Sequence, residues 1–221
     1  MKNLALLILV PFALAAAPVP DAARERLLAD AAQLGPATLA FDRTIVASQS
    51  GGGDKASETR IDRWNGKSWT LLSVNGKPPT SDDLAHERKM TADMPVPGYY
   101  RLAKQFAAAT TTTDASGRTV LHVAKLPSGS VNANGKDITE HFTADAIVAA
   151  GPRPFITQVR LTAREPFRMM LVAKVDSFVT VNDYRLGARG TPELVRQTTD
   201  IDGNMLGKSG LQHNETSFAH H

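Results

Sequence analysis

The sequence contains no cysteine, which excludes disulfide bonds. A bacterial lipoprotein carries its lipid on a cysteine, so we also expect that the chain is not itself a lipoprotein. No charge of one sign dominates, because 25 basic and 22 acidic side chains leave a formal net charge of +3. No half, tail or stripe of the chain is strongly basic, and this balance argues against a nucleic-acid partner.

Sequence motifs of common enzyme classes are incomplete or absent. Residues 86–90 begin like a zinc-protease helix, but methionine stands where the second histidine ligand would be. Residues 203–209 resemble a phosphate-binding loop that is one residue too short, and no G-x-S-x-G elbow occurs. We interpret His220-His221 as a frayed tail rather than a metal site. We therefore expect a protein that is not an enzyme, with no catalytic residues, metal or cofactor; a hydrolase with His122 or His141 as base is the alternative.

The first residues have the features of an export signal. Lys2 precedes an apolar run over residues 4–17, which is shorter than the roughly 20 residues of a membrane-spanning helix. Ala13-Leu14-Ala15 matches the small-x-small cleavage rule, so we expect a signal peptide over residues 1–15. The rest of the chain has no second long apolar run, which predicts no transmembrane segment in the mature protein. The expected location is the periplasm of a Gram-negative bacterium.

Alternating apolar and polar residues predict a mainly β protein of the α+β class. Period-two segments and turn signals indicate nine or ten strands, largely as a meander after residue 119. Helices are predicted at residues 21–34, 81–89 and 99–109. No repeat or clear linker divides the chain, so residues 16–221 are interpreted as a single β-rich domain.

Local signals place the turns. Asn65-Gly66 and Asp202-Gly203 each predict a tight hairpin, and the first is expected to have positive φ at both residues. Asn75-Gly76 is expected to end a strand. Loops are also expected at residues 48–55 and 110–117. Residues 167–175 are expected to form one unbroken strand.

Large apolar side chains recur on the predicted strands. Aromatic residues and methionine can line an adaptable hydrophobic cavity, and they can equally fill an ordinary core. Arg43 lies among apolar residues of the first predicted strand, where a charge needs a partner or a position at a rim. It can meet a polar head group at the mouth of a cavity, or pair with Asp62 or Glu58 on a neighbouring strand. The candidate wall residues for an apolar ligand are Phe41, Trp64, Trp69, Phe167, Met169 and Phe178.

The order of the predicted elements is similar to that of a known protein class. An N-terminal helix is followed by hairpins, short helices in the middle and a final meander, over roughly residues 21–212. This layout resembles the LolA/LolB class of periplasmic lipoprotein carriers. Residues 69–80 and 164–171 are also similar to a group of uncharacterised secreted proteins of Gram-negative bacteria.

The resemblance implies both a shape and a function. In the LolA/LolB class an antiparallel sheet curves into an incomplete barrel, and helices cover its apolar concave face. We therefore expect a curved sheet with an N-terminal helix and short covering helices. The expected function is non-enzymatic binding of an apolar ligand, a lipid or the acyl chains of a lipoprotein. The alternative is an envelope structural or assembly protein with a filled core and no small-molecule ligand.

Overall fold

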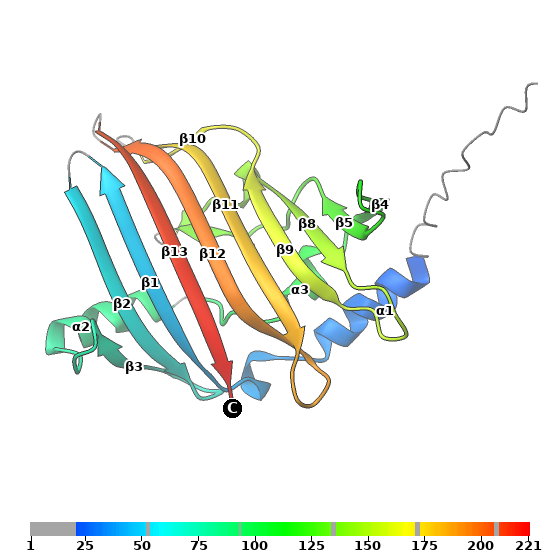
Figure 1. Cartoon of the computed structure of the whole chain (residues 1–221), viewed down its shortest axis with the longest axis horizontal. Helices are drawn as coiled ribbons and strands as arrows, with labels where there is room; N and C mark the ends of the chain where they lie inside the picture. Colours follow the sequence, from blue (N-terminus) through cyan, green and yellow to red (C-terminus); the bar gives the residue numbers. More distant parts are fainter. Residues whose placement is uncertain (1–20, 52–53, 93, 134–135, 171–172, 206–207) are drawn as a thin grey trace, which may run out of the picture.

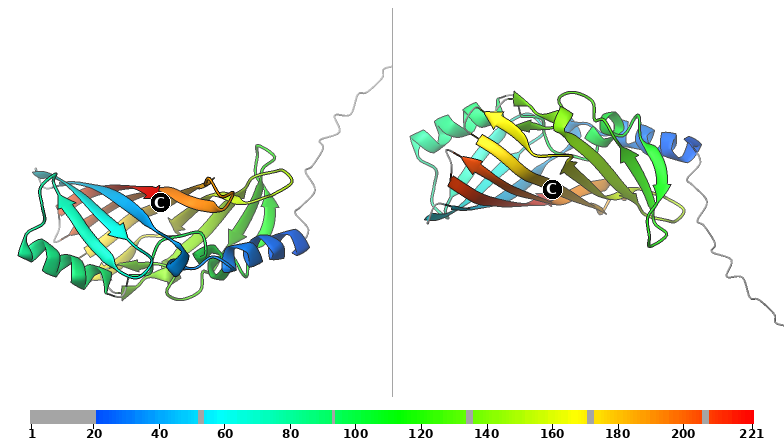
Figure 2. Two further views of the ribbon diagram at one scale, coloured as in Figure 1. Left: turned by 90° about the horizontal axis from the view of Figure 1, so that it is seen from below. Right: turned by 90° about the horizontal axis from the view of Figure 1, so that it is seen from above.

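A broad antiparallel sheet dominates the computed structural model, and it does not close into a barrel. Its strands follow the order β3-β2-β1-β13-β12-β11-β9-β8-β5-β4, and β10 pairs with β11. Figure 1 shows the sheet in front and the helices behind it, and Figure 2 shows that the helices lie on one side. The predicted mainly β fold, with a large sheet and covering helices, is confirmed. The structure describes all residues except 1–20, 52–53, 93, 134–135, 171–172 and 206–207, so the predicted signal peptide lies outside it.

The described chain contains three α-helices, two short 3-10 turns and thirteen strands. The helical segments are α1 (Asp21–Ala32), η1 (Pro36–Thr38), α2 (Ser81–Thr91), α3 (Arg101–Gln105) and η2 (Thr139–His141). The first strands are β1 (Phe41–Gly51), β2 (Asp54–Trp64), β3 (Trp69–Val74), β4 (Thr110–Thr113), β5 (Thr119–Val123), β6 (Asn132–Ala133) and β7 (Lys136–Asp137). The later strands are β8 (Phe142–Val148), β9 (Ile156–Ala163), β10 (Phe167–Met170), β11 (Ala173–Leu186), β12 (Pro192–Met205) and β13 (Lys208–His220). β6 and β7 form a separate small hairpin.

Long-range pairing overrides several local signals. β1 and β2 extend into the predicted loop at residues 48–55, and the threonines of β4 form an edge strand where a loop was expected. Residues 167–175 are not one strand, because β10 folds back on β11 and Phe167 pairs with Val175. The hairpin predicted at Asp202-Gly203 is also wrong, since both residues lie inside β12. In each case a neighbouring strand provides backbone hydrogen-bond partners that local propensity does not report.

The two asparagine–glycine pairs differ in the turns that they form. The loop from Asn65 to Ser68 has positive φ only at Gly66, and the Asn65 side chain accepts hydrogen bonds from the backbone N–H groups of Lys67 (3.0 Å) and Ser68 (2.9 Å). The expectation of positive φ at both residues of Asn65-Gly66 is therefore wrong. Asn75-Gly76 has this geometry instead, with φ values of 50° and 73°. It ends β3 as expected.

The first and last strands of the chain are neighbours in the sheet. β1 pairs with β13 along its whole length, from Phe41 opposite His220 to Gly51 opposite Gly210. The C-terminal histidines are therefore not a frayed tail. His220 Nε2 lies 2.7 Å from the carbonyl oxygen of Leu194, and the backbone N–H of His221 donates to the carbonyl oxygen of Ala40.

The sheet has a core-forming inner face, on the side of the helices, and an outer face. Leu27 and Ala31 of α1 and Leu102 of α3 are buried in the same cluster as the inner-face residues. Tyr99, before α3, packs edge-on against Tyr184 of β11, and its hydroxyl accepts a hydrogen bond from the backbone of Ile156. Burial raises the pKa of Tyr99 to about 12. The helical side of the core is thus attached to the middle of the sheet.

Three glycines occupy one row across β1, β13 and β12, where Gly51 and Gly203 both pair with Gly210. The neighbouring backbone is so close here that a side chain has no room. A Cβ atom on Gly203 would lie 2.4 Å from the carbonyl oxygen of Lys174. Glycine within strands is typical of such tight bends and close approaches.

We expect Gly203→Ala to lower the free energy of unfolding by about 1–3 kcal/mol, because the clashing atoms are backbone and cannot rotate away. Gly35→Ala is the matched control: Gly35 has extended backbone, and a Cβ there meets nothing within 4 Å. Urea unfolding should show a change below about 0.5 kcal/mol for the control. Equal effects of the two substitutions would contradict the proposed close packing.

Candidate functional site

Three of the six predicted wall residues form an aromatic cluster at the β1–β3 side of the inner face. The ring of Phe41 lies 5.7 Å from that of Trp69 and 5.4 Å from that of Phe218, between centroids. Trp64 and Trp69 are 5.4 Å apart. Trp64 also donates from its indole nitrogen to the carbonyl oxygen of Pro36 at 2.9 Å. These side chains pack against one another and against the core.

The other three wall residues lie on β10 and β11. Phe142 of β8 packs edge-on against both Phe167 and Phe178, with centroid distances of 5.9 Å and 5.0 Å. The ring of His141 stacks on Phe167 at 4.2 Å, and Met169 packs on the same core. Two strands, β13 and β12, separate β1 from β11, and the register places Phe178 in the row of Gln49, eight residues along β1 from Phe41. The two clusters are therefore separated both across the sheet and along its strands. The structure therefore brings the six residues together as two groups.

Between the two clusters, the inner face of the central strands is half-buried. Apolar and polar side chains alternate across it: Asn182 accepts a hydrogen bond from Gln197 (2.7 Å), and the hydroxyls of Thr180 and Thr199 are 3.0 Å apart. These are in-register partners of β11 and β12. We call this surface the central strip; its half-buried members are Ile45, Ala47, Phe178, Asn182, Gln197, Thr199, Ile201 and Asn214.

A buried ion pair joins β1 to β2 beside the first cluster. Arg43 Nε and one terminal nitrogen each lie 2.7 Å from Asp62 Oδ2, and Asp62 is fully buried. The guanidinium group also lies 4.0 Å from the centroid of the Trp69 ring. Of the predicted alternatives for Arg43, pairing with Asp62 is confirmed. Arg43 is only 8% exposed, so its charge faces protein groups.

Helix α2 is attached to this ion pair by a carboxylate. Thr80 and Asp83 form a capping box at the start of the helix. Glu87 is the buried residue of the helix, and its Oε2 lies 2.6 Å from Arg60 of β2. Burial, and next the charge of Asp62, raises the pKa of Glu87. One oxygen each of Glu87 and Asp62 is buried without a hydrogen-bond partner in the described structure.

Two arginine–aspartate pairs at adjacent register positions permit a matched test of the buried pair. Arg43 pairs with Asp62 on the inner face, and Asp42 pairs with Arg63 on the outer face. We expect Asp62→Ala to lower the free energy of unfolding by about 3–5 kcal/mol, because the buried Arg43 loses its partner at 2.7 Å and keeps only the more distant Glu87 carboxylate, at 3.8 Å. Asp42→Ala should cost about 0–1 kcal/mol, since Arg63 remains in water. Urea unfolding of both variants measures the difference, and similar losses would contradict the assigned burial.

We expect the contribution of Glu87 to the free energy of unfolding to fall as pH rises through the titration of this residue. Its pKa is raised on folding, so the neutral acid is favoured in the folded state. The resulting stabilisation is complete below the ordinary glutamate pKa and is lost as pH rises through the higher folded value. Urea midpoints of wild type and Glu87→Gln, measured from pH 4 upward, should converge or cross along this interval. A difference that stays constant with pH would refute the assignment.

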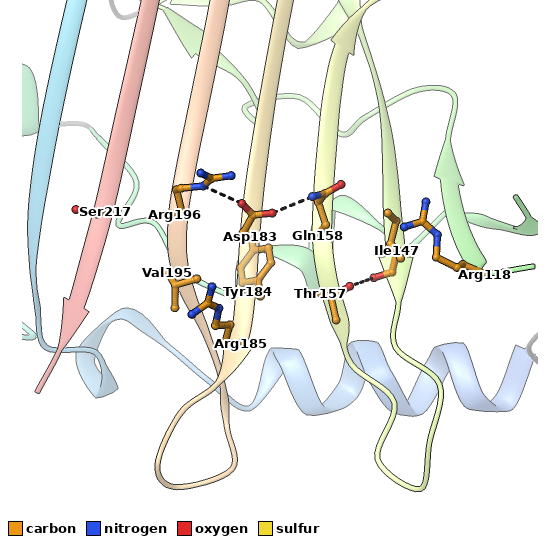
Figure 3. Close-up of a pocket in the computed structure, with 10 residues that line it drawn as sticks. All are labelled: Arg118, Ile147, Thr157, Gln158, Asp183, Tyr184, Arg185, Val195, Arg196 and Ser217. Atoms are coloured by element: carbon orange, nitrogen blue, oxygen red, sulfur yellow. Dashed lines mark hydrogen bonds and ion pairs between the residues drawn. The ribbon is translucent and has the colours of Figure 1, made fainter. Parts of the chain in front are cut away.

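The outer face carries a hollow of about 610 Å³ over its β8–β12 portion (Figure 3). Its floor is a row of register partners, one from each neighbouring strand: Ser217, Arg196, Asp183, Gln158 and Ile147. No signal in the sequence indicated this site. The complete lining is Arg118, Ile147, Thr157, Gln158, Asp183, Tyr184, Arg185, Val195, Arg196 and Ser217.

Two β-bulges coincide with this hollow. Arg196 pairs with Asp183, but the next pair is Leu194 with Tyr184, so Val195 is an extra residue in β12. In the same way, Thr157 is the extra residue between the pairs that β9 makes with β8. Both extra residues line the hollow. Because bulges bend a strand and re-aim its side chains, we attribute the concavity to them.

The histidines named as possible bases lie in ordinary cross-strand or stacking positions. His122 Nδ1 is 2.7 Å from Asp145 on the outer face, where both side chains are more than a third exposed. His213 makes a similar pair with Asp200 (2.6 Å) beside a second hollow of about 720 Å³, whose lining includes residues of both faces, Ile201 among them. The Ser48 hydroxyl next to it donates to the backbone carbonyl of His213 at 3.3 Å. The described residues contain no group of three or more side chains suited to hold a metal ion.

Comparison with known proteins returned no relative. No protein-family model, no curated protein and no solved structure matches the chain. In the part of the chain that the structure describes, no helix is both long enough and apolar enough to cross a membrane.

Proposed function

We propose that the protein is a non-enzymatic, exported binding protein for an amphipathic lipid, with the central strip as its ligand-binding surface. The ligand is an acyl chain with a polar head, free or attached to a lipoprotein. Export to the periplasm of a Gram-negative bacterium is part of the proposal and depends on the signal-like residues 1–15. The resemblance of the layout to the LolA/LolB carriers agrees with this function.

The observation that supports the proposal is that most side chains in the middle of the inner face are only half-buried, with Thr180 and Thr216 buried among them, while both flanks are packed. An inner face that only formed a core would bury its central side chains as completely as Phe41 and Phe142, which are fully buried. Instead Phe178 and Ile201 are partly accessible on the helical side of the sheet. Concave, mainly apolar surfaces with a few convergent polar groups are typical of small-molecule sites.

The chemistry of the strip suits an amphiphile. Ile45, Ala47, Phe178 and Ile201 can contact methylene groups, each worth about 0.8 kcal/mol when buried. The amide and hydroxyl groups of the remaining members can hold a head group by hydrogen bonds. Eight buried methylenes would supply roughly 6 kcal/mol before the cost of ordering the chain.

Ile201→Asn should weaken binding of a fluorescent fatty acid to delipidated protein at least tenfold, because it places an amide against the acyl chain. Val46→Asn is the matched control, since Val46 is a branched residue on a central strand that is 42% exposed on the outer face. Probe titrations, with circular dichroism to check folding, measure both variants. The proposal fails if wild type shows no saturable uptake, or if the two variants bind equally.

A second candidate is an envelope assembly protein with a filled core. The packing of the six predicted wall residues in two aromatic clusters favours it, because their rings contact one another or the core rather than lining a common cavity. Native mass spectrometry of protein purified from the periplasm separates the two candidates. A co-purified lipid mass supports the binding protein, and a bare chain with a protein partner supports the assembly protein.

A further inference from the structure

We propose that the outer hollow between β8 and β12 binds a phosphate-bearing ligand. The site lies on the face of the sheet opposite to the central strip, so this proposal does not depend on the proposed lipid site. Its shape is set by the backbone, because the bulges at Thr157 and Val195 form its concavity. Such a hollow exists before a ligand arrives and needs little reorganisation to accept one.

Three arginines line the hollow, against one carboxylate, that of Asp183. Both oxygens of Asp183 are engaged: Gln158 donates to Oδ1 at 2.9 Å, and Arg196 donates through Nε to Oδ2 at 3.1 Å (Figure 3). The negative charge is therefore already neutralised within the lining. Because Asp114, just outside the lining, pairs with Arg118, the hollow keeps an excess of one positive charge, which favours an anion.

The arginines retain donors for a ligand. Arg118 binds Asp114 through Nε at 2.7 Å, and Arg196 also uses Nε for its ion pair. The four terminal N–H groups of each guanidinium are left for a further acceptor. Arg185 has no hydrogen-bond or ion-pair partner among the described residues. Glu193, its register partner, lies against Gly187, where a Cβ would meet the Glu193 carboxylate.

The geometry of these donors suits an oxyanion such as phosphate. A guanidinium is planar and presents paired N–H groups that match two oxygens of a phosphate. Arg185 and Arg196 lie on the adjacent strands β11 and β12 and can together hold more than one phosphate oxygen, while Arg118 lines the far side of the hollow from the β4–β5 turn. The Ser217 hydroxyl adds a neutral donor, whereas that of Thr157 already donates to the carbonyl oxygen of Ile147 at 3.2 Å. The β8–β9 and β11–β12 loops leave this end of the strands (Figure 3), and their sequences contain the exposed residues Arg153 and Arg189. The phosphate can belong to a lipid headgroup or to a soluble ester.

The test uses two probes on the full-length mature protein at low ionic strength. Calorimetry with inorganic pyrophosphate reports a soluble phosphate ligand. Co-sedimentation with vesicles of phosphatidylcholine containing phosphatidic acid, against phosphatidylcholine alone, reports a headgroup. Binding of either probe should weaken as sodium chloride is added, because the contacts are ionic and partly exposed.

Arg185→Gln should reduce affinity for the bound probe about tenfold, since it removes one charged hydrogen-bonding group. Arg185→Lys should bind the probe more tightly than Arg185→Gln, because it keeps the positive charge. Arg88→Gln, the same change at an exposed position of helix α2, should leave the affinity of the wild type unaltered. Pyrophosphate binding with this pattern supports a soluble ligand, and vesicle binding alone supports a lipid headgroup. Absence of binding to both probes, or equal affinities of Arg185→Gln and Arg88→Gln, overturns the proposal.

Discussion

The pairing of β1 with β13 is the constraint on which the rest of the structure depends. It joins the first strand of the domain to the last, so the three N-terminal strands and the later meander form one sheet. Closing so long a loop is entropically costly, and the continuous ladder from Phe41 to Gly51 offsets that cost. The same register brings Phe41 against Phe218 and aligns Gly51 with Gly210. Both the aromatic cluster and the bend of the sheet follow from it.

The alternation of side chains then gives the sheet two faces with different chemistry. Adjacent residues of β1 show this clearly, because Arg43 is buried against Asp62 while Asp42 meets Arg63 in water. On the inner face the ion pair, the aromatic clusters and Glu87 fix the helices to the strands. On the outer face the same alternation lines up polar residues across many strands, and two bulges turn part of that row into a hollow.

How far the sequence predicted these features differs between elements. Helix α1 and the pair Arg43–Asp62 were predictable, since each depends on a local pattern or on the cost of burying a lone charge. The strand of threonines at β4 was not, because its partner β5 supplies the stabilisation. The candidate wall residues were recognised as apolar, but their division into two clusters depends on the two strands that lie between β1 and β11. The outer hollow had no sequence signal, as a bulge is a property of two strands together.

The sequence by itself determined the class of the protein: a β-rich chain with few helices, nearly balanced charge and no cysteine, in which period-two alternation demands a sheet with one buried face. Only the tertiary structure decided which strands are neighbours, where β12 continues through Gly203, and where Val195 and Thr157 interrupt the ladders. The physical reason is that alternation specifies which face a side chain takes. It does not specify the partner strand, and both candidate sites are made by side chains from several partner strands.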